Sequence, residues 1–387
     1  MLTLFVLIVI LSILVLVHEF GHFYAARRNN VRVEEFGWGI PPRIWGKKIG
    51  ETIYSINWLP FGGFVKLMGE DLEEGTSPEA SKNLDKTVSD ERSFRSKTPL
   101  QRIVILLAGV FMNVILAVAL YFVMFLITNF HTMTLPLFFD YRFKFGQVDR
   151  INTVVGAFSP DSVAKTAGIE VGDAILEVDG VPVYSSDDIR RELASKDGKE
   201  VRVLTMDIKK TDRPVEALKV SVKANEGGNV LLGVLLTPAF RINYGGSQVQ
   251  KLTSGFSHTY NMAAYSLHTL GGLFRLAIEE RNVAPVSESV SSPVGVSRVI
   301  SSILTYSGKE ILVGLIDLTA LLSVSLAIMN VLPFPALDGG RFFFVLVELI
   351  RGKKISDKVE GYVHRWGMLF LLALLVLITV KDIRSFF

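Results

Sequence analysis

Four long stretches of the chain carry almost no charged side chains. Two of them, 103–139 and 366–380, contain no Lys, Arg, Asp or Glu, and two others, 1–26 and 311–337, contain one acidic residue each. A helix needs about 20 mostly apolar residues to cross a hydrocarbon core of about 30 Å. The pattern therefore predicts four membrane-spanning helices, with most of the charged residues placed in the segments between them.

The first apolar stretch has two interpretations, a retained span or a cleaved secretory signal. A secretory signal begins with basic residues and ends at a cleavage site formed by small residues. This chain has no Lys or Arg before Arg27, and the apolar run continues past Glu19 to Ala26 without a convincing site of that kind. The stretch is therefore predicted to be a retained span.

Lys and Arg near the span ends predict the orientation of the chain, because they collect on the cytoplasmic side of a membrane. The segment 27–99 has arginines at its start and Arg95 and Lys97 at its end, and the segment 339–365 is rich in Lys and Arg. Both segments are expected in the cytoplasm. The N-terminus and the large insert 130–310 are then expected outside it.

Turn and capping signals inside the insert predict a compact α+β module over 146–224. Serine followed by proline is typical of a helix start, and Asp-Gly between two apolar runs is typical of a β-hairpin. With the alternation of apolar residues, these signals predict a helix from Ser159-Pro160 to Gly168, a hairpin at Asp179-Gly180, a helix from Ser185 to Leu193, and strands at 201–206 and 215–222.

The run from Ser159 to Gly180 resembles a bacterial PDZ domain. It reads Ser-Pro-x-Ser-x-Ala-x-x-Ala-Gly-Ile-x-x-Gly-Asp-x-Ile-x-x-Val-Asp-Gly. PDZ domains bind extended peptides, often C-termini, by adding a strand to a sheet. The resemblance implies peptide termini as partners of this domain; the alternative is a PDZ-like fold that serves only as a spacer or steric filter.

Apolar residues recur at helical spacing over 249–277, with polar residues between them. The pattern predicts an amphipathic helix that lies on the outer membrane face. The stretch from Thr253 to Phe274 is uncharged, so a fifth crossing stays open as an alternative.

Composition narrows the classes of function. The chain is 49% hydrophobic and 20% charged, as expected for a protein of the lipid bilayer. A net charge of +3, without a basic cluster interleaved with aromatic residues, argues against a nucleic-acid partner. The chain has no cysteine, which excludes disulfides, a cysteine nucleophile and thiolate metal sites. A metal ion would need His, Asp or Glu ligands.

The first apolar stretch contains an HExxH sequence, His18-Glu19-Phe20-Gly21-His22. Residues four apart on a helix share a face and are separated by about 6 Å along the axis, so both imidazoles can reach one tetrahedral zinc. Glu19 then lies beside the metal, where it can act on a bound water. Ionisable residues inside an apolar span are costly to bury unless they are paired, coordinated or facing a cavity. The sequence predicts a Zn²⁺ site here.

A zinc ion held by two histidines needs a third protein ligand if one position stays open for water. At the edges of the spans the acidic candidates are Asp317 and Asp338. Asp338 follows the third apolar stretch of the chain, 311–337, and is expected on the same side of the membrane as the two histidines. The prolines and glycines of 330–340 break the helix around it, which a membrane tolerates where protein or a wet cavity surrounds the backbone. These features favour Asp338.

Together the motifs resemble those of bacterial site-2 proteases, which are intramembrane zinc metalloproteases. The resemblance covers nearly the whole chain. It rests on the HEFGH run at 18–22, the Asn-x-x-Pro-x-Pro-x-Leu-Asp-Gly-Gly run at 330–340, the PDZ-like domain between the second and third spans, and Ser292-Pro293-Val294-Gly295 before the third span.

The resemblance also implies roles for individual residues. It gives His18, His22 and Asp338 as zinc ligands, Glu19 as the catalytic glutamate, and Asn330, Pro333 and Pro335 as residues near the substrate. Asn113 in the second span either hydrogen-bonds to a neighbouring helix or orients the zinc site. The other four histidines are expected to be interfacial or structural.

The 53–67 segment resembles the family's membrane-associated β-hairpin. A peptide bond in a helical substrate is shielded by its own hydrogen bonds, so the substrate has to become extended before it is cut. An edge strand of the hairpin could pair with it and replace the lost hydrogen bonds. Ile53, Ile56 and Val65 are the expected contacts, and proline at any of them is expected to slow cleavage.

The predicted fold is an α-helical polytopic membrane protein with about four transmembrane helices, a membrane-associated β-hairpin and an inserted α+β PDZ domain. The expected domains are an N-terminal membrane half at 1–145, the PDZ domain at 146–225, a linker with the amphipathic helix at 226–310, and a C-terminal membrane half at 311–387. The expected location is the bacterial inner membrane, with the PDZ domain outside the cytoplasm and the zinc site toward it.

The predicted activity is hydrolysis of peptide bonds in the transmembrane segments of single-span membrane proteins, by Glu19-assisted attack of zinc-bound water. By resemblance, the process is regulated intramembrane proteolysis, and the substrates are anti-sigma factors or remnant signal peptides. Two alternatives are an ion-coupled or proton-coupled transporter and a PDZ-containing scaffold without catalysis. The chain lacks an inverted repeat and has an intact HExxH, which favours the protease.

Overall fold

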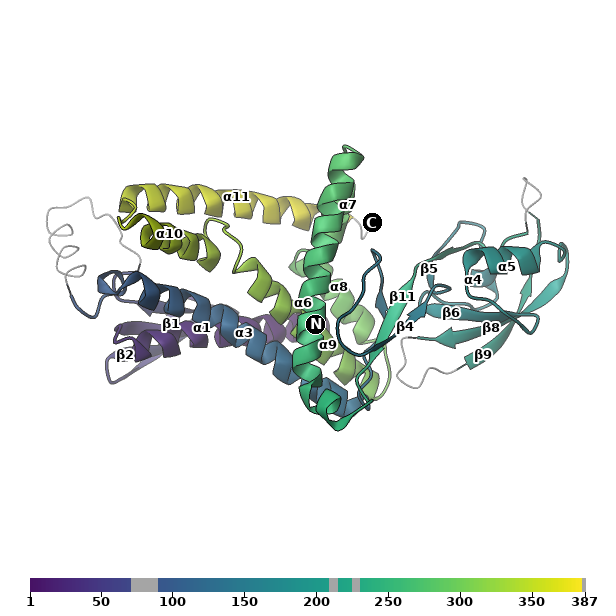
Figure 1. Cartoon of the computed structure of the whole chain (residues 1–387), viewed down its shortest axis with the longest axis horizontal. Coiled ribbons are helices and arrows are strands. Elements are labelled where there is room, and N and C mark those ends of the chain that lie inside the picture. Colours follow the sequence, from purple (N-terminus) through teal and green to yellow (C-terminus); the bar gives the residue numbers. More distant parts are fainter. Residues whose placement is uncertain (71–89, 209–214, 225–229, 385–387) are drawn as a thin grey trace. The chain divides into compact units, whose positions relative to one another are not determined.

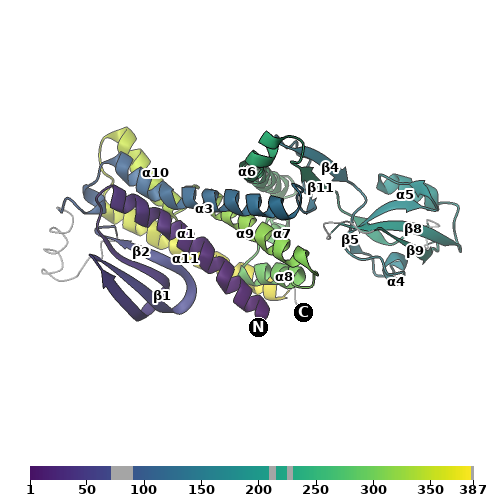
Figure 2. The same ribbon diagram turned by 90° about the horizontal axis from the view of Figure 1, so that it is seen from below.

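The structure is a computed structural model that describes all residues except 71–89, 209–214, 225–229 and 385–387. It divides into two compact units, which are drawn from two directions in Figures 1 and 2. Unit 1 contains residues 1–120, 273–305 and 318–387, and unit 2 contains residues 121–272 and 306–317.

Four of the described helices are long and apolar enough to cross a membrane. They are α1 (Leu2–Arg28), α3 (Pro99–Ile127), α9 (Lys309–Met329) and α11 (Asp357–Arg384). These helices coincide with the four predicted stretches. Many of their apolar side chains are exposed, and only 11% of the most apolar stretch of α11 is buried. Exposed apolar surface of this extent requires lipid around it, which makes the chain a multi-pass membrane protein.

The helix bounds differ from the charge-free stretches that predicted them. The stretch 103–139 is uncharged, but α3 ends at Ile127 because Asn129 and Phe130 adopt left-handed backbone conformations, with φ of 52° and 64°. At the other end of the chain, α11 begins at Asp357, before its charge-free core. An uncharged stretch indicates residues within the membrane. The backbone conformation determines the residue at which the helix ends.

Strands β1 (Val33–Ile49) and β2 (Thr52–Leu67) form a long bent hairpin that packs against α1 (Figure 2). Each strand contributes two segments to one small sheet. The residues of 35–38 lie opposite 53–56 on one side and opposite 63–66 on the other, and 45–49 lie opposite 52–56. The order across the sheet is therefore 63–67, 33–38, 52–57 and 45–49. Only the first and last of these segments are at an edge.

Within its described residues, unit 1 contains four further short elements. They are η1 (Phe94–Ser96), α7 (Ala284–Ser289), α8 (Pro293–Ile303) and α10 (Asp338–Arg351). A cluster of buried side chains that includes Phe23, Ile105, Leu106 and Val345 joins α1, α3 and α10. This packing brings together segments that are more than three hundred residues apart in the chain.

Unit 2 contains the α+β module and several flanking strands (Figure 1). Its four-stranded antiparallel sheet has the order β7-β6-β8-β9, from β6 (Asp173–Val178), β7 (Val181–Pro182), β8 (Glu200–Asp207) and β9 (Val215–Ser221). Strand β5 (Val155–Phe158) pairs with β10 (Val234–Leu236), and β11 (Ala239–Asn243) lies between β3 (Leu135–Pro136) and β4 (Gln147–Ile151). The module's short helices are α4 (Val163–Thr166) and α5 (Ser186–Leu193).

Most of the local predictions for the module are confirmed. The hairpin turns at Asp179-Gly180, with Val178 opposite Val181. The Oγ of Ser185 caps α5 by accepting a hydrogen bond from the Asp188 N–H at 3.2 Å, and α5 ends at the expected residue, Leu193.

The first predicted helix start and the predicted end of the module are wrong. Ser162, not Ser159, caps α4, because the hydroxyl of Ser159 donates to the carbonyl of Gly233 instead. The module also extends past residue 225. Val230 and Leu232 lie in its core, and β10 follows them.

Helix α6 (Gln248–Glu279) has its polar side buried and its apolar side exposed. Asn261 donates to the carbonyl of Phe145 and to the hydroxyl of Tyr244, each at 2.8 Å, and His258 lies beside the same hydroxyl. The exposed apolar residues include Leu252, Phe256 and Phe274. Among the described helices α6 is not one of the four candidate spans, so the helix is amphipathic as expected, and its place at the membrane surface stays a prediction.

Candidate metal centre

Helix α1 places the two histidines of the HExxH sequence side by side. Residues four apart lie on the same face of a helix, and the ring centroids of His18 and His22 are 4.7 Å apart. Their Nε2 atoms face each other at 3.1 Å, and both side chains are buried. The first half of the candidate site is therefore formed by a single helical turn.

Asp338 completes the cluster from the other end of the chain. It is the first residue of α10, and its Oδ2 lies 2.8 Å from the Nε2 of His18 and 3.2 Å from the Nε2 of His22. Burial alone would raise the pKa of the Asp338 carboxyl, but the two imidazoles hold that pKa below its ordinary value. The carboxylate is therefore ionised and turned toward both rings.

Two glycines after Asp338 let the broken segment 330–337 fold back on the start of α10. A Cβ on Gly339 would lie 2.0 Å from the carbonyl oxygen of Leu332, and a Cβ on Gly340 would lie 2.5 Å from that of Phe334. No other residue type fits such contacts. The Asp-Gly-Gly sequence thus sets the approach of the aspartate to the two imidazoles.

The geometry of the cluster fits a zinc ion. Bonds of about 2.0–2.1 Å to a tetrahedral zinc place the ligand atoms about 3.3 Å from one another. The three facing atoms here are separated by 2.8, 3.1 and 3.2 Å. Two imidazole nitrogens and one carboxylate oxygen are also a usual ligand set for zinc. In the described part of the chain, no other group of three such residues comes together in this way.

Residues of helix α3 contact the Nδ1 atoms of both imidazoles and so orient the rings. The Nδ1 of His22 lies 2.8 Å from the carbonyl oxygen of Ile105, so in the neutral ring Nδ1 carries the proton and Nε2 keeps its lone pair for a metal. The amide of Asn113 lies against the Nδ1 of His18 at 3.3 Å.

The Asn113 amide supports the same tautomer in His18. Its Oδ1 is buried and has no partner among the described residues. The oxygen and nitrogen of an amide are assigned rather than seen, and exchanging them lets Oδ1 accept the Nδ1 proton of His18. Of the two interpretations of Asn113, this contact favours orientation of the zinc site.

Gly109 leaves room for the ion, and Gly21 allows α1 and α3 to approach closely. A Cβ on Gly109 of α3 would lie 2.4 Å from the Nε2 of His22 and 2.8 Å from the Nε2 of His18. A Cβ on Gly21 would lie 2.3 Å from the carbonyl oxygen of Ala108. Neither glycine was predicted to have a role, although small residues are the usual sign of close helix contact in a membrane.

Replacing Gly109 by alanine is expected to remove zinc from the protein. The added methyl group would occupy the space in front of both Nε2 atoms, and we expect zinc affinity to fall at least tenfold, as it does when support of metal ligands is lost. The measurement is bound zinc per chain after dialysis. Gly361→Ala is the matched control, because nothing lies within 4 Å of a Cβ at that position. Equal zinc in both variants would contradict the assigned position of the ion.

Glu19 is held by the outer segment of the hairpin. Its Oε2 accepts a hydrogen bond from the backbone N–H of Val65 at 3.1 Å. Val65 belongs to the segment 63–67, which is at one edge of the small sheet. The edge strand therefore contacts the residue next to the first candidate ligand.

The structure separates the predicted substrate contacts into two groups. Val65 lies in the edge segment, but Ile53 and Ile56 lie in the inner segment and have backbone partners on both sides, opposite 35–38 and 45–49. Ile53 and Ile56 therefore do not offer an edge to a substrate. The prediction that Ile53 and Ile56 lie at an edge is wrong, because 35–38 and 45–49 lie on either side of them.

Asn330, Pro333 and Pro335 lie in the segment that joins α9 to α10, close in sequence to Asp338. None of them is a member of the metal cluster found in the described residues. Pro335 packs on Gly367 of α11, where an added Cβ would lie 2.1 Å from the Cβ of the proline. The three residues therefore lie outside the cluster, and their contact with a substrate stays a prediction.

The other polar candidates lie outside the cluster. Asp317, the alternative third ligand, is buried in α9 but is not a member of the group formed among the described residues. His258 is fully buried, and burial lowers its pKa to about 3, so its ring is neutral. The Nδ1 of His364 accepts a hydrogen bond from the N–H of Ala336 at 2.9 Å. These contacts give the two histidines structural roles.

Among solved structures, the PDZ domain of an SdrC-like protein from Listeria monocytogenes is similar to part of the chain. It is 22% identical, covers 25% of this chain and 93% of the domain, and has a TM-score of 0.19. This similarity is too weak to support an argument, so the module is described only by its own strands and helices.

Comparison of the whole sequence gives a much stronger result. The profile of peptidase family M50 matches residues 6–374. An inferred zinc metalloprotease of Clostridium perfringens is 34% identical over 96% of each chain, and the zinc metalloprotease RasP of Geobacillus kaustophilus is 25% identical over 98% of this chain and 97% of the relative. The chain therefore belongs to peptidase family M50, the site-2 protease family, and is a zinc metalloendopeptidase.

Proposed function

We propose that this metalloprotease hydrolyses peptide bonds inside the transmembrane segments of single-span membrane proteins. The observation that carries the proposal is the convergence of His18, His22 and Asp338 around one point. The two histidines lie in α1, a helix that is apolar enough to cross a membrane. The Nε2 atoms of the two histidines and the Oδ2 of the aspartate would hold the zinc ion. When bound, zinc supplies Lewis-acid activation of water and of a peptide carbonyl.

Glu19 is the group placed to move the proton. The N–H of Val65 binds one carboxylate oxygen at 3.1 Å, and the other oxygen is then available to the attacking water. Glu19 accepts the proton of that water and donates it to the leaving amine. Ile105 and Asn113 keep the imidazoles fixed while the proton moves. The residues of this chain thus supply orientation and proton transfer.

The edge segment 63–67 is the proposed binding strand for an extended substrate. The N–H and C=O of one strand residue point to the same side, and this side alternates along the strand. Because the N–H of Val65 points at Glu19, the carbonyls of Val65 and Gly63 face the same side. A substrate strand along this edge would replace the hydrogen bonds that its own helix has lost.

Pairing with this edge predicts an alternating effect of proline in the substrate. Proline at a position whose N–H pairs with the edge removes one hydrogen bond, and we expect cleavage to fall about 2- to 10-fold. Proline at the positions between these should leave cleavage unchanged or faster, because it also weakens the substrate helix. Cleavage rates of a proline scan, with an alanine scan as control, test this. A uniform effect along the scan counts against strand pairing.

The module of unit 2 has a groove that suits an extended peptide. The groove, with a volume of about 420 Å³, lies between α5 and β10 and is lined by Ile189, Arg190, Leu193 and the residues 231–236. Within the described residues β10 pairs only with β5, so its other edge faces the groove. We propose that this edge binds peptide termini, with the 231–233 segment as the binding site for the terminal carboxylate.

A peptide with a free C-terminal carboxylate is expected to bind the intact protein more tightly than the same peptide with an amidated end. The loss of one charge-assisted contact to backbone N–H groups should weaken binding about tenfold. Titration of both peptides by calorimetry gives the difference. Equal affinity would argue against the carboxylate site, and no binding of either peptide would favour the spacer role.

We also infer the location and the substrates of the enzyme. The Lys and Arg residues at both ends of 27–99 and within 339–365 favour a cytoplasmic position for the hairpin and α10. The N-terminus and the module would then lie outside the cytoplasm of a bacterial inner membrane. Anti-sigma factors and remnant signal peptides, processed by regulated intramembrane proteolysis, are the proposed substrates.

The proposed function is tested with the purified protein in lipid vesicles and a single-span substrate. Cut sites identified by mass spectrometry are expected inside the apolar segment of the substrate. Cleavage should stop when a chelator removes the zinc and should return when zinc is added. Cleavage that survives complete removal of zinc, or cut sites confined to the polar flanks, would refute the proposal.

A further inference from the structure

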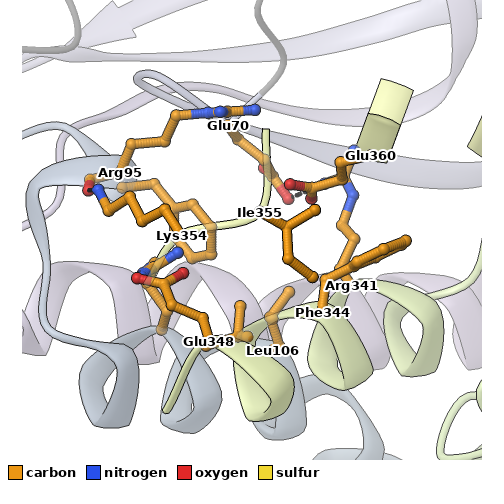
Figure 3. A pocket seen from close by; sticks show the side chains of 12 residues that line it. Glu70, Arg95, Leu106, Arg341, Phe344, Glu348, Lys354, Ile355 and Glu360 are labelled. Carbon is orange, nitrogen blue, oxygen red and sulfur yellow. Dashed lines mark hydrogen bonds and ion pairs between the residues drawn. The ribbon is translucent and has the colours of Figure 1, made fainter. Parts of the chain in front are cut away.

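Two ion pairs surround a small polar cavity in unit 1. The cavity has a volume of about 140 Å³ and lies between α3, α10 and the end of the hairpin (Figure 3). Arg102 donates to Glu348 at 2.6 Å, and Arg341 donates to Glu70. Figure 3 shows the side chains of Arg341 and Glu348 rising from α10 into this region, with Glu70 opposite. Neither pair has a part in the proposed reaction.

Both pairs are largely withdrawn from solvent. The exposed fractions of the side chains are 8% for Arg102 and 12% for Glu348, and 29% for Arg341 and 16% for Glu70. A buried ion pair adds little net stability compared with apolar residues of the same volume. Its value lies in a fixed geometry, since an arginine opposite a carboxylate tolerates few arrangements.

Each pair joins α10 to another part of the metal centre. Arg341 is three residues after Asp338, about one helical turn away, and its partner Glu70 follows β2, which contains the Val65 N–H that binds Glu19. Arg102 lies in α3, which contains the Ile105 carbonyl and the Asn113 amide that orient His22 and His18.

The way in which Asp338 reaches the site explains why such support is needed. The segment 330–337 breaks the helical connection from α9 to α10, so α9 cannot fix the aspartate through a continuous helix. The position of α10 has to be set by contacts along its own length. Glu348 and Arg341 supply charged contacts at two points of α10, each to an element that supports a different part of the site.

We propose that the pairs Arg341–Glu70 and Arg102–Glu348 are positioning residues that set the place of the Asp338 carboxylate relative to the two imidazoles. This inference rests on the proposed function, in which Asp338 is a zinc ligand. The pairs fix α10 against β2 and α3, and thereby set the affinity for zinc and the geometry around the ion.

The test uses Arg341→Gln, Glu70→Gln and Arg102→Gln in the full-length protein. Each is expected to weaken zinc binding by about 10- to 100-fold, as loss of support for a metal ligand does. The visible absorption spectrum of the cobalt-substituted protein should change, because it depends on the geometry of the ligands. Arg92→Gln is the matched control: its pair with Glu51 is exposed and does not involve α10. This variant should bind zinc as the wild type does.

Charge reversal separates positioning from a general loss of folding. Arg341→Glu together with Glu70→Arg restores an ion pair and is expected to recover zinc affinity and the cobalt spectrum, at least in part. Where a glutamine variant is unstable in detergent, Arg341→Lys keeps the charge but not the planar guanidinium, and should retain more of the zinc affinity than Arg341→Gln. Glutamine variants with wild-type zinc affinity and cobalt spectrum would overturn the inference, and so would a reversal that recovers nothing.

The His22→Ala variant distinguishes failure of this inference from failure of the proposed function. If His22→Ala loses zinc while the three glutamine variants keep it, the metal centre is supported and the positioning role is refuted. If His22→Ala keeps zinc at full affinity, the ion is bound elsewhere, and both proposals fall.

Discussion

Replacing Glu19 by glutamine is expected to abolish cleavage and to leave the bound zinc unchanged. Glutamine has the size of glutamate and keeps an oxygen that can accept the Val65 N–H. It cannot accept a proton from water, and general acid–base catalysis contributes about 10²- to 10⁴-fold to a rate. Single-turnover cleavage of a single-span substrate and zinc per chain are the two measurements.

The control for Glu19→Gln is Glu51→Gln, which neutralises a carboxylate in an exposed ion pair of the hairpin. Its cleavage rate should stay near that of the wild type. Cleavage by Glu19→Gln within a few-fold of the wild-type rate would remove Glu19 from the mechanism. Loss of zinc from the same variant would instead make Glu19 a metal ligand.

The cluster could be anticipated from the sequence because each half of it depends on local rules. His18 and His22 lie four residues apart on one helix, so their proximity follows from helix geometry alone. Asp338 could be identified because two prolines precede it and two glycines follow it at the end of an apolar stretch. Short-range patterns of this kind do not depend on how the rest of the chain packs.

The parts that could not be anticipated depend on long-range packing. Whether a strand is at an edge depends on every segment beside it, and the pairing of 35–38 with both 53–56 and 63–66 moved Ile53 and Ile56 into the interior of the sheet. The role of Gly109 depends on the contact between α1 and α3, and the hydrogen bond from Val65 to Glu19 depends on how the hairpin packs against α1. None of these contacts leaves a periodic pattern in the sequence.

The same limit explains the two errors in the α+β module. Ser159 has the sequence of a helix cap, but its hydroxyl donates to Gly233, more than seventy residues later, and Ser162 caps α4 in its place. The strand that completes the module, β10, also lies after the expected boundary. Local propensity identified the hairpin, α5, β8 and β9 correctly, whereas distant partners decided where α4 begins and which strands complete the module.

Replacing Asp338 by asparagine is expected to remove zinc and to abolish cleavage. The asparagine keeps the shape of the side chain but loses the negative charge that faces both imidazoles at 2.8 and 3.2 Å. A neutral amide is a much weaker ligand for zinc than a carboxylate. Because a ligand itself is lost, zinc affinity should fall by more than the roughly 10- to 100-fold that follows loss of a supporting contact. Competition with a chelator of known affinity measures the change.

Asp317→Asn is the matched control for Asp338→Asn, because it makes the same chemical change at the other acid of the apolar stretches. Asp317 is buried in α9 and lies outside the cluster formed by the described residues. The folded variant should keep zinc at the wild-type affinity. The opposite pattern, with zinc lost from Asp317→Asn and kept by Asp338→Asn, would transfer the third ligand to α9. The Asp-Gly-Gly turn would then serve only to end the preceding segment. The inference that ion pairs position α10 for the metal centre would also be refuted.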